Sequence, residues 1–231
     1  MFIQFFLMMV FSVLVLNPLS AQTDLPLTYL WKPKYYASVE GQERLTYARS
    51  FARSQMKFAD LDGDDDMDLL IGKGDGRLAL FRNIGNPKES NLRLETEDFE
   101  VIHEEKDANQ QLMYLNKIVD VGKNAAPDLA DIDDDGDLDL FVGSSDGQIF
   151  FFENRGNKLL PKFFRVTPIY MNLNFVGNSV PRFADLNGDL AKDLIVGLKD
   201  GRVMIYFNSG VSTNALFCNC LLYTSPSPRD S

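Results

Sequence analysis

Three short segments of this chain concentrate oxygen-bearing side chains at a spacing that suits a hard metal ion. They cover residues 60–68, 131–139 and 185–193, and we name them loop 1, loop 2 and loop 3. In each loop, Asp or Asn occupies the first, third, fifth and ninth positions, and the backbone carbonyl of the seventh position is a further candidate ligand. So many carboxylates within one loop repel one another unless a cation lies among them, and calcium accepts about six to eight oxygen ligands in a flexible geometry. We therefore expect three calcium sites.

The candidate ligands form three sets of five residues. They are Asp60, Asp62, Asp64, Asp66 and Asp68 in loop 1; Asp131, Asp133, Asp135, Asp137 and Asp139 in loop 2; and Asp185, Asn187, Asp189, Ala191 and Asp193 in loop 3. At the sixth position the chain must turn sharply, and loop 2 has Gly136 there, whereas loop 1 has Asp65 and loop 3 has Leu190. Loop 3 also has the fewest carboxylates. We therefore expect loop 3 to bind calcium most weakly.

The residues that follow each loop distinguish it from an EF-hand. An EF-hand needs a bidentate Glu at the twelfth position, which is occupied here by Ile71, Val142 and Val196. Instead, a short apolar run follows each loop, and an Asp-Gly pair then precedes a second apolar run. Because Asp-Gly turns supply positive φ, this pattern predicts a β-hairpin after every loop. A simpler alternative is that the loops are only polar turns, but three copies at matched offsets favour metal binding.

The complete repeating pattern of loop, hairpin and Asn-x-Gly ending resembles a VCBS/FG-GAP repeat. Residues 127–156 carry it most clearly, and residues 56–85 and 180–210 are similar. This family includes the calcium-bearing blades of the integrin alpha-chain propeller. The resemblance implies an all-β fold of β-propeller blades, calcium on the loops between adjacent strands, a role in binding or adhesion, and no catalytic residues. Leu190 and Ala191 depart from the pattern, which makes occupancy of loop 3 by calcium less certain than that of loops 1 and 2.

The spacing of the repeats agrees with propeller blades. The first Asp residues of successive loops lie 71 and 54 residues apart, and strand-like segments at 92–102 and 163–170 bring each repeat to about four strands. We expect a signal peptide at 1–21, an N-terminal strand segment or partial blade at 22–55, and repeats at 56–125, 126–179 and 180–210, the last one truncated. About three blades do not close a ring, which takes roughly four to eight. A longer protein or a partner is therefore expected to complete it.

Both ends of the chain differ from the repeats. Residues 2–16 are almost entirely apolar and lead to small residues up to Ala21, which predicts cleavage of a signal peptide rather than an uncleaved membrane anchor. We expect no membrane span in the mature chain and a secreted or bacterial cell-surface location. Residues 220–230 match the translation of a transposase-type sequencing adapter, and the alternative is a natural Pro- and Ser-rich tail. We therefore treat 211–231 as an uncertain junction and a sequencing artefact, with the remainder of the protein missing.

Composition narrows the function but leaves several roles open. A net charge of -10 argues against nucleic-acid binding. The single histidine, His103, lies among acidic residues, and no catalytic motif appears, so we expect no enzymatic activity. The expected partner is an extracellular protein or carbohydrate ligand. The alternatives are a non-catalytic module of a larger secreted enzyme, such as a polysaccharide-degrading one, and a scaffold for partner proteins.

Overall fold

The computed structural model describes residues 54–86, 90–167, 169–209 and 215–217, together with the backbone of 218–224 and of three short strands near the N-terminus. These strands are β1 (Gln4–Phe5), β2 (Ala37–Val39) and β3 (Gln42–Arg44), and they form a sheet of their own. Apart from them, the expected signal peptide (1–21) and most of the expected N-terminal segment (22–55) lie outside the described residues, as do residues 210–214 and 225–231.

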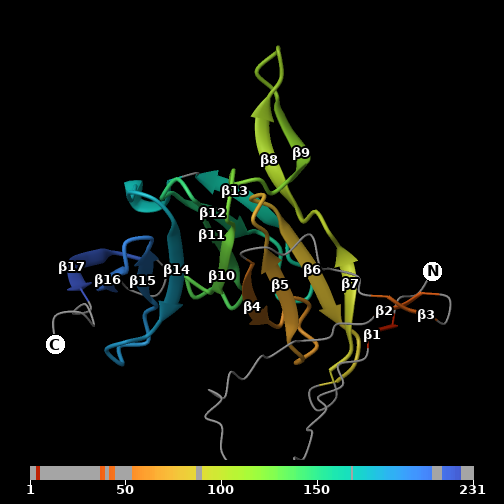
Figure 1. Cartoon of the computed structure of the whole chain (residues 1–231). Helices are drawn as coiled ribbons and strands as arrows, with labels where there is room; N and C mark the ends of the chain where they lie inside the picture. The colour runs from red at the N-terminus through yellow and green to blue at the C-terminus, as the bar shows by residue number, and fades with distance from the viewer. Residues whose placement is uncertain are drawn as a thin grey trace, which may run out of the picture.

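Three blades, each of four antiparallel strands, follow one another along the chain and lie side by side (Figure 1). Blade 1 contains β4 (Gln55–Ala59), β5 (Asp68–Gly72), β6 (Leu78–Asn83) and β7 (Leu92–Thr96). Blade 2 contains β10 (Ala126–Ala130), β11 (Asp139–Gly143), β12 (Ile149–Asn154) and β13 (Phe163–Thr167). Blade 3 contains β14 (Ser179–Ala184), β15 (Asp193–Leu198), β16 (Arg202–Asn208) and β17 (Phe217–Thr224). The expected all-β fold of propeller-type blades is confirmed, and the described blades do not close a ring.

The strands follow from the sequence pattern. The apolar runs after each loop form the second and third strands of a blade, joined by a turn in which Gly76, Gly147 or Gly201 has positive φ. This is the conformation that the Asp-Gly pairs predict. Blade 3 takes its fourth strand from β17, which lies beyond the end of the repeat pattern at residue 210.

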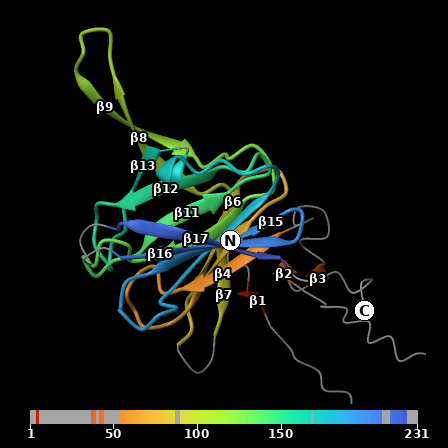
Figure 2. The same ribbon diagram turned by 90° about the vertical axis from the view of Figure 1, so that its left-hand side faces the viewer.

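An extra hairpin accounts for the longer spacing between the first two loops. The segment 92–102, expected as one strand-like piece, divides into β7 and the start of β8 (Glu100–Lys106), which pairs with β9 (Leu112–Ile118). β8 also pairs in parallel with β13, so the hairpin extends the sheet of blade 2. It projects away from the blades in both views (Figures 1 and 2). The only helical element among the described residues is the 3-10 turn η1 (Tyr170–Asn172), and no described helix is long and apolar enough to cross a membrane.

The core lies between the blades, because the second and third strands of blades 1 and 2 bury side chains on both faces. One apolar cluster joins Leu70, Leu78 and Leu80 of blade 1 to Leu140, Val142, Phe150 and Phe152 of blade 2. A second cluster joins Phe141 and Ile149 on the other face of blade 2 to Leu194 and Val196 of blade 3. Each fully buried aliphatic or aromatic side chain contributes about 1.5–3 kcal/mol. These interfaces therefore hold neighbouring loops in fixed relative positions.

A glycine at the end of the second strand permits close approach of the next blade. A Cβ atom on Gly72 would lie 2.0 Å from the carbonyl oxygen of Ala125, and one on Gly143 would lie 2.1 Å from that of Ser179. Backbone hydrogen bonds join the two blades beside this glycine. Next to Gly143, Ser179 N–H of blade 3 donates to the carbonyl of Ser144 at 3.0 Å. At Gly197, the equivalent position of blade 3, the nearest described atom would lie 3.9 Å away.

Candidate metal centres

All three loops adopt the same backbone path between the first and second strands of their blades. In each loop the fourth and sixth residues have positive φ, between 60° and 93°: Gly63 and Asp65, Asp134 and Gly136, Gly188 and Leu190. The sequence predicts the turn at the sixth position, but the second left-handed residue, at the fourth position, was missed. Leu190 is 85% exposed and its φ is 74°, a conformation that costs a non-glycine residue about 1–2 kcal/mol.

The first-position aspartate of each loop holds this turn. Asp60 Oδ1 accepts a hydrogen bond from Gly63 N–H at 2.6 Å, and Asp185 Oδ1 accepts one from Gly188 N–H at 2.7 Å. In loop 2, Asp131 Oδ2 accepts from Gly136 N–H at 3.1 Å. The carboxylates that begin the loops are therefore oriented toward the loop interior by their own backbone.

The ninth-position aspartate ties each loop to the third strand of its blade. The side chains of Asp68, Asp139 and Asp193 are at most 2% exposed. Their Oδ1 atoms accept a backbone N–H from the third strand: from Asn83 at 2.7 Å, from Asn154 at 2.7 Å and from Asn208 at 2.8 Å. Any ion that binds this carboxylate is thus linked to the hairpin as well as to the loop.

These asparagines have a structural role that the sequence analysis did not assign, although it includes them in the Asn-x-Gly ending. The Asn154 Oδ1 atom accepts the N–H groups of Gly156, at 3.0 Å, and Lys162, at 2.7 Å, and so shapes the turn into the fourth strand. Asn83 does the same with Gly85 and Asn91. The recurrent Asn-x-Gly ending was the signal, and its cause is this pair of hydrogen bonds.

Loop 2 brings its carboxylates together without a basic partner among the described residues. Oxygen atoms of Asp131, Asp133 and Asp135 lie within 4.8 Å of one another. Asp131 Oδ1, Asp137 Oδ1 and Asp139 Oδ2 are buried and have no hydrogen-bond partner among the described residues. Burial, together with the neighbouring carboxylates, raises the pKa of Asp137 to about 6 and that of Asp139 to about 7. Within the described residues, no ion pair joins Lys or Arg to a carboxylate of loop 2.

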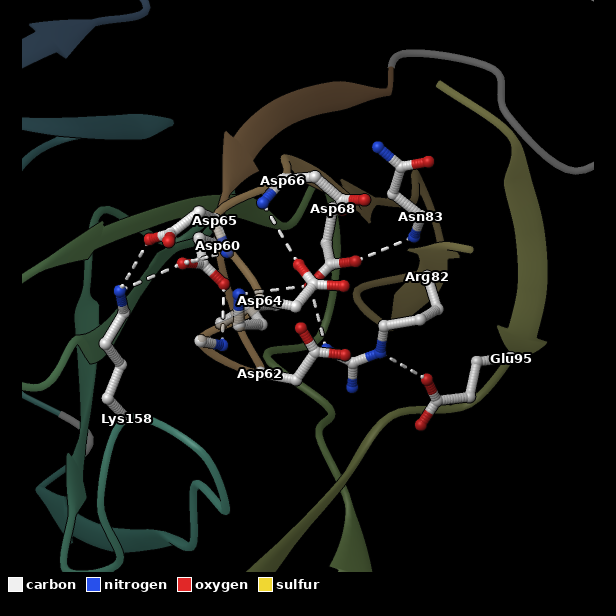
Figure 3. A network of polar contacts seen from close by, with 12 residues as sticks. Asp60, Asp62, Asp64, Asp65, Asp66, Asp68, Arg82, Asn83, Glu95 and Lys158 are labelled. Carbon is white, nitrogen blue, oxygen red and sulfur yellow. Dashed lines mark hydrogen bonds and ion pairs between the residues drawn. The ribbon is translucent and has the colours of Figure 1, made fainter. Parts of the chain in front are cut away.

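Loop 1 has a similar cluster of carboxylates, but two basic side chains, Arg82 and Lys158, contact it from other elements (Figure 3). Asp60, Asp62 and Asp64 have oxygen atoms within 4.8 Å of one another, and Asp62 Oδ1 and Asp66 Oδ1 are buried without a hydrogen-bond partner in the described chain. One guanidinium nitrogen of Arg82 lies 2.8 Å from Asp68 Oδ2 and 3.4 Å from Asp62 Oδ2. Lys158 Nζ lies 3.1 Å from Asp60 Oδ2 and 3.4 Å from Asp65 Oδ1.

The pKa values in loop 1 reflect this mixed environment. Burial, followed by the nearby carboxylates, raises the pKa of Asp66. For Asp62, burial also raises the pKa, although Arg82 opposes it. Burial acts to raise the pKa of Asp60, but the hydrogen bonds from Lys158 and from the loop backbone together lower it.

In loop 3, hydrogen bonds within the loop itself occupy the carboxylate oxygens of the fifth position. The Asn187 side-chain amide donates to Asp189 Oδ2 at 2.8 Å, and Ala191 N–H donates to Asp189 Oδ1 at 2.9 Å. The pKa of Asp185 is lowered, first by the hydrogen bond from Gly188 N–H. Asn187 and Asp189 are exposed, and Ala191 can offer an ion only its backbone carbonyl. The structure therefore assembles a carboxylate cluster in loops 1 and 2, and a mixed amide and carboxylate group in loop 3.

The donor sets of loops 1 and 2 fit calcium. Asp66, Asp137 and Asp139 are at least nine-tenths buried, and each has an oxygen with no hydrogen-bond partner in the described part of the chain. A buried charged oxygen without a partner is costly, and a hard cation supplies the missing interaction. A groove of about 430 Å³ lies between loops 1 and 2 and is lined by Asp60, Asp131 and Asp137, among others, so solvent reaches both loops.

Comparison with known proteins bears on the middle of the chain. Residues 131–196 match the model of the FG-GAP-like repeat, a segment that runs from the first aspartate of loop 2 through loop 3 into β15. No curated protein and no solved structure matches the chain. The matched segment contains two of the three loops described above and the complete hairpin of blade 2. Residues 131–196 therefore carry an FG-GAP-like repeat, consistent with the FG-GAP/VCBS repeat family.

Proposed function

We propose that this chain is a secreted calcium-binding propeller module that binds an extracellular protein or carbohydrate ligand. The observation that carries the calcium assignment is the set of buried carboxylate oxygens in loops 1 and 2 that have no hydrogen-bond partner within the described chain. In loop 2 the carboxylates have no compensating basic residue among the described residues. Extracellular calcium modules bind at roughly 10⁻⁴–10⁻³ M free ion, which fits exposed loops on a secreted protein.

The role of calcium in this proposal is structural. The ninth-position carboxylate contacts both the loop and the backbone of the third strand, as Asp139 does through Asn154. An ion at loop 2 would neutralise the carboxylates that otherwise repel one another, and would hold the first two strands and the hairpin together. The proposal assigns no catalytic role, because the clustered carboxylates act as ligands and His103 stands outside these loops.

Calcium binding is tested by the thermal unfolding of the full chain with calcium and with chelator. An ion that binds only the folded protein stabilises it by about 2.7 kcal/mol at a concentration one hundred times Kd, so we expect a clear rise in Tm with calcium. Asp133→Asn should reduce this rise. Asp134→Asn is the matched control, because Asp134 lies in the same loop at the fourth position and is exposed. Equal Tm values with calcium and with chelator would contradict the proposal.

The binding role needs a separate measurement. The full chain, labelled and applied to arrays of glycans and of extracellular proteins, should be retained in the presence of calcium and released by chelator. Equal retention with calcium and with chelator would show that ligand binding does not depend on calcium in the loops. Absence of retention on both arrays would count against a binding or adhesion role.

A further inference from the structure

One oxygen atom distinguishes the two calcium loops. In loop 2, Asp139 Oδ2 is buried and has no hydrogen-bond partner among the described residues. The equivalent atom in loop 1, Asp68 Oδ2, accepts hydrogen bonds from Leu61 N–H at 3.0 Å and from the Arg82 guanidinium at 2.8 Å. The positive charge that is missing in loop 2 is therefore supplied by the protein itself in loop 1 (Figure 3).

Arg82 is specific to blade 1. It directly precedes the asparagine that binds the ninth-position carboxylate, and the residues at the same place in blades 2 and 3 are Glu153 and Phe207. Arg82 is fixed from the other side by Glu95, whose Oε2 atom lies 2.8 Å from Arg82 Nε. The Arg82 side chain is only 19% exposed, so its interaction with the loop is weakly screened by water.

A second cation reaches loop 1 from the neighbouring blade. Lys158 belongs to the turn between β12 and β13 of blade 2, and its ammonium group contacts Asp60 and Asp65. The next residue, Leu159, lies close to Gly63, where a Cβ would come within 2.7 Å of its side chain. The contact between blade 2 and loop 1 thus holds Lys158 beside the first-position carboxylate.

We infer that Arg82 and Lys158 act as tethered counter-ions that make loop 1 a weak calcium site, while loop 2 is the tight one. This inference rests on the proposed calcium function. A cation within about 4 Å of ligand oxygens repels a second cation and competes for the same lone pairs. Calcium therefore fills loop 2 first, and fills loop 1 only at a higher concentration, against the charge of Arg82 and Lys158.

The inference is tested by calorimetric calcium titration of the full chain and its variants. The wild-type protein should show a tight and a weak class of sites, with Asp133→Asn removing the tight class and Asp62→Asn removing loop 1 from the weak class. Arg82→Gln should raise the calcium affinity of the weak class by about tenfold, because it removes one positive charge from beside the candidate ligands of loop 1. The reciprocal change, Glu153→Arg, should weaken the tight class by a similar factor.

Two further variants make the outcome decisive. Arg77→Gln removes the same charge from blade 1 at a residue that pairs with Asp98, outside the loop, and should leave both classes unchanged. Lys158→Gln tests the same idea if Arg82→Gln fails to fold, because the Lys158 side chain is half-exposed. It should raise the calcium affinity of the weak class by about threefold. Calcium binding that neither Arg82→Gln nor Lys158→Gln tightens would overturn this inference and leave the calcium function standing. A wild-type protein that binds no calcium would overturn both.

Discussion

Replacing Gly143 with alanine tests whether the blades are held together by close backbone contact. The new Cβ would lie 2.1 Å from the carbonyl oxygen of Ser179 and 2.7 Å from Pro181 Cδ. Atoms at such a position do not approach closer than 3.0 Å, so β14 must recede by nearly 1 Å. Ser179 has little freedom to move, because its N–H is bonded to the carbonyl of Ser144 at 3.0 Å and its hydroxyl to that of Gln148 at 2.7 Å.

The loss of stability caused by Gly143→Ala depends on how far β14 must be displaced. Inserting one methyl group into a close-packed site costs about 1–3 kcal/mol, and the upper end applies when the obstacle is backbone rather than a flexible side chain. The loss of glycine flexibility in the unfolded chain returns about 0.4–1 kcal/mol. Displacing β14 also loosens the apolar cluster between blades 2 and 3, which includes Phe141 and Leu194. We expect Gly143→Ala to lower the free energy of unfolding by about 3 kcal/mol.

Urea unfolding at saturating calcium, followed by circular dichroism, measures this change. Gly197→Ala is the matched control, since it occupies the same position in blade 3 and its Cβ would meet no described atom closer than 3.9 Å. The control should be neutral or stabilising by about 0.5 kcal/mol. A Gly143→Ala protein as stable as the wild type, or a Gly197→Ala protein equally destabilised, would refute the reasoning.

Three other changes have expected outcomes that unfolding experiments can check. Asn154→Ala should destabilise the protein by about 2 kcal/mol, because two backbone N–H groups lose their acceptor. Asp128→Ala should cost about 3 kcal/mol or more, because the fully buried carboxylate pairs with Lys57 at 2.6 Å and accepts Phe183 N–H at 2.7 Å. Without calcium, the free energy of unfolding should fall by up to about 3 kcal/mol between pH 5 and 8, because burial raises the pKa of Asp139 to about 7.

The direction of the pH effect follows from proton binding. An unfolded aspartate releases its proton near pH 4, whereas folded Asp139 keeps it until about pH 7, so stability is lost as the pH rises through that window. The pKa of His103 is lowered, first by burial, and this residue therefore acts in the opposite direction. The measurement is best made in His103→Gln, and stability that is constant or rises between pH 5 and 8 would contradict the prediction. Under the proposed calcium function, the ion should abolish the fall, because it would pair with the ionised carboxylates.

The features that could be predicted from the sequence are those determined by local spacing. The hairpins follow from apolar runs joined by Asp-Gly, and the structure pairs β11 with β12 as expected. The clustering of Asp131, Asp133 and Asp135 follows from alternate positions in a tight loop. In both cases the residues that interact are close together in the chain, so their order fixes their geometry.

The features that could not be predicted depend on contacts between distant residues. Lys158 lies 93 residues from Asp65, and only the packing of blade 2 against blade 1 brings them together. The division of the segment 92–102 between two sheets depends on the parallel pairing of β8 with β13, for which the sequence contains no local signal. No sequence motif marks Arg82 as a partner of Asp68 either, because its role depends on which side of β6 faces that carboxylate.

Residues that recur in every repeat fall into two physical classes, and the two classes predict different consequences of mutation. The aspartate–asparagine hydrogen bond lies within one blade, since Asp139 contacts Asn154 of its own hairpin, so its loss should have a similar cost in each blade. The glycine at the end of the second strand serves the following blade, as Gly143 does for β14, whose atoms lie nearest to its Cβ position. Its substitution should therefore cost stability only where another blade packs against it. A recurrent residue is thus evidence of a local constraint or of an interface, and the difference between Gly143 and Gly197 separates the two.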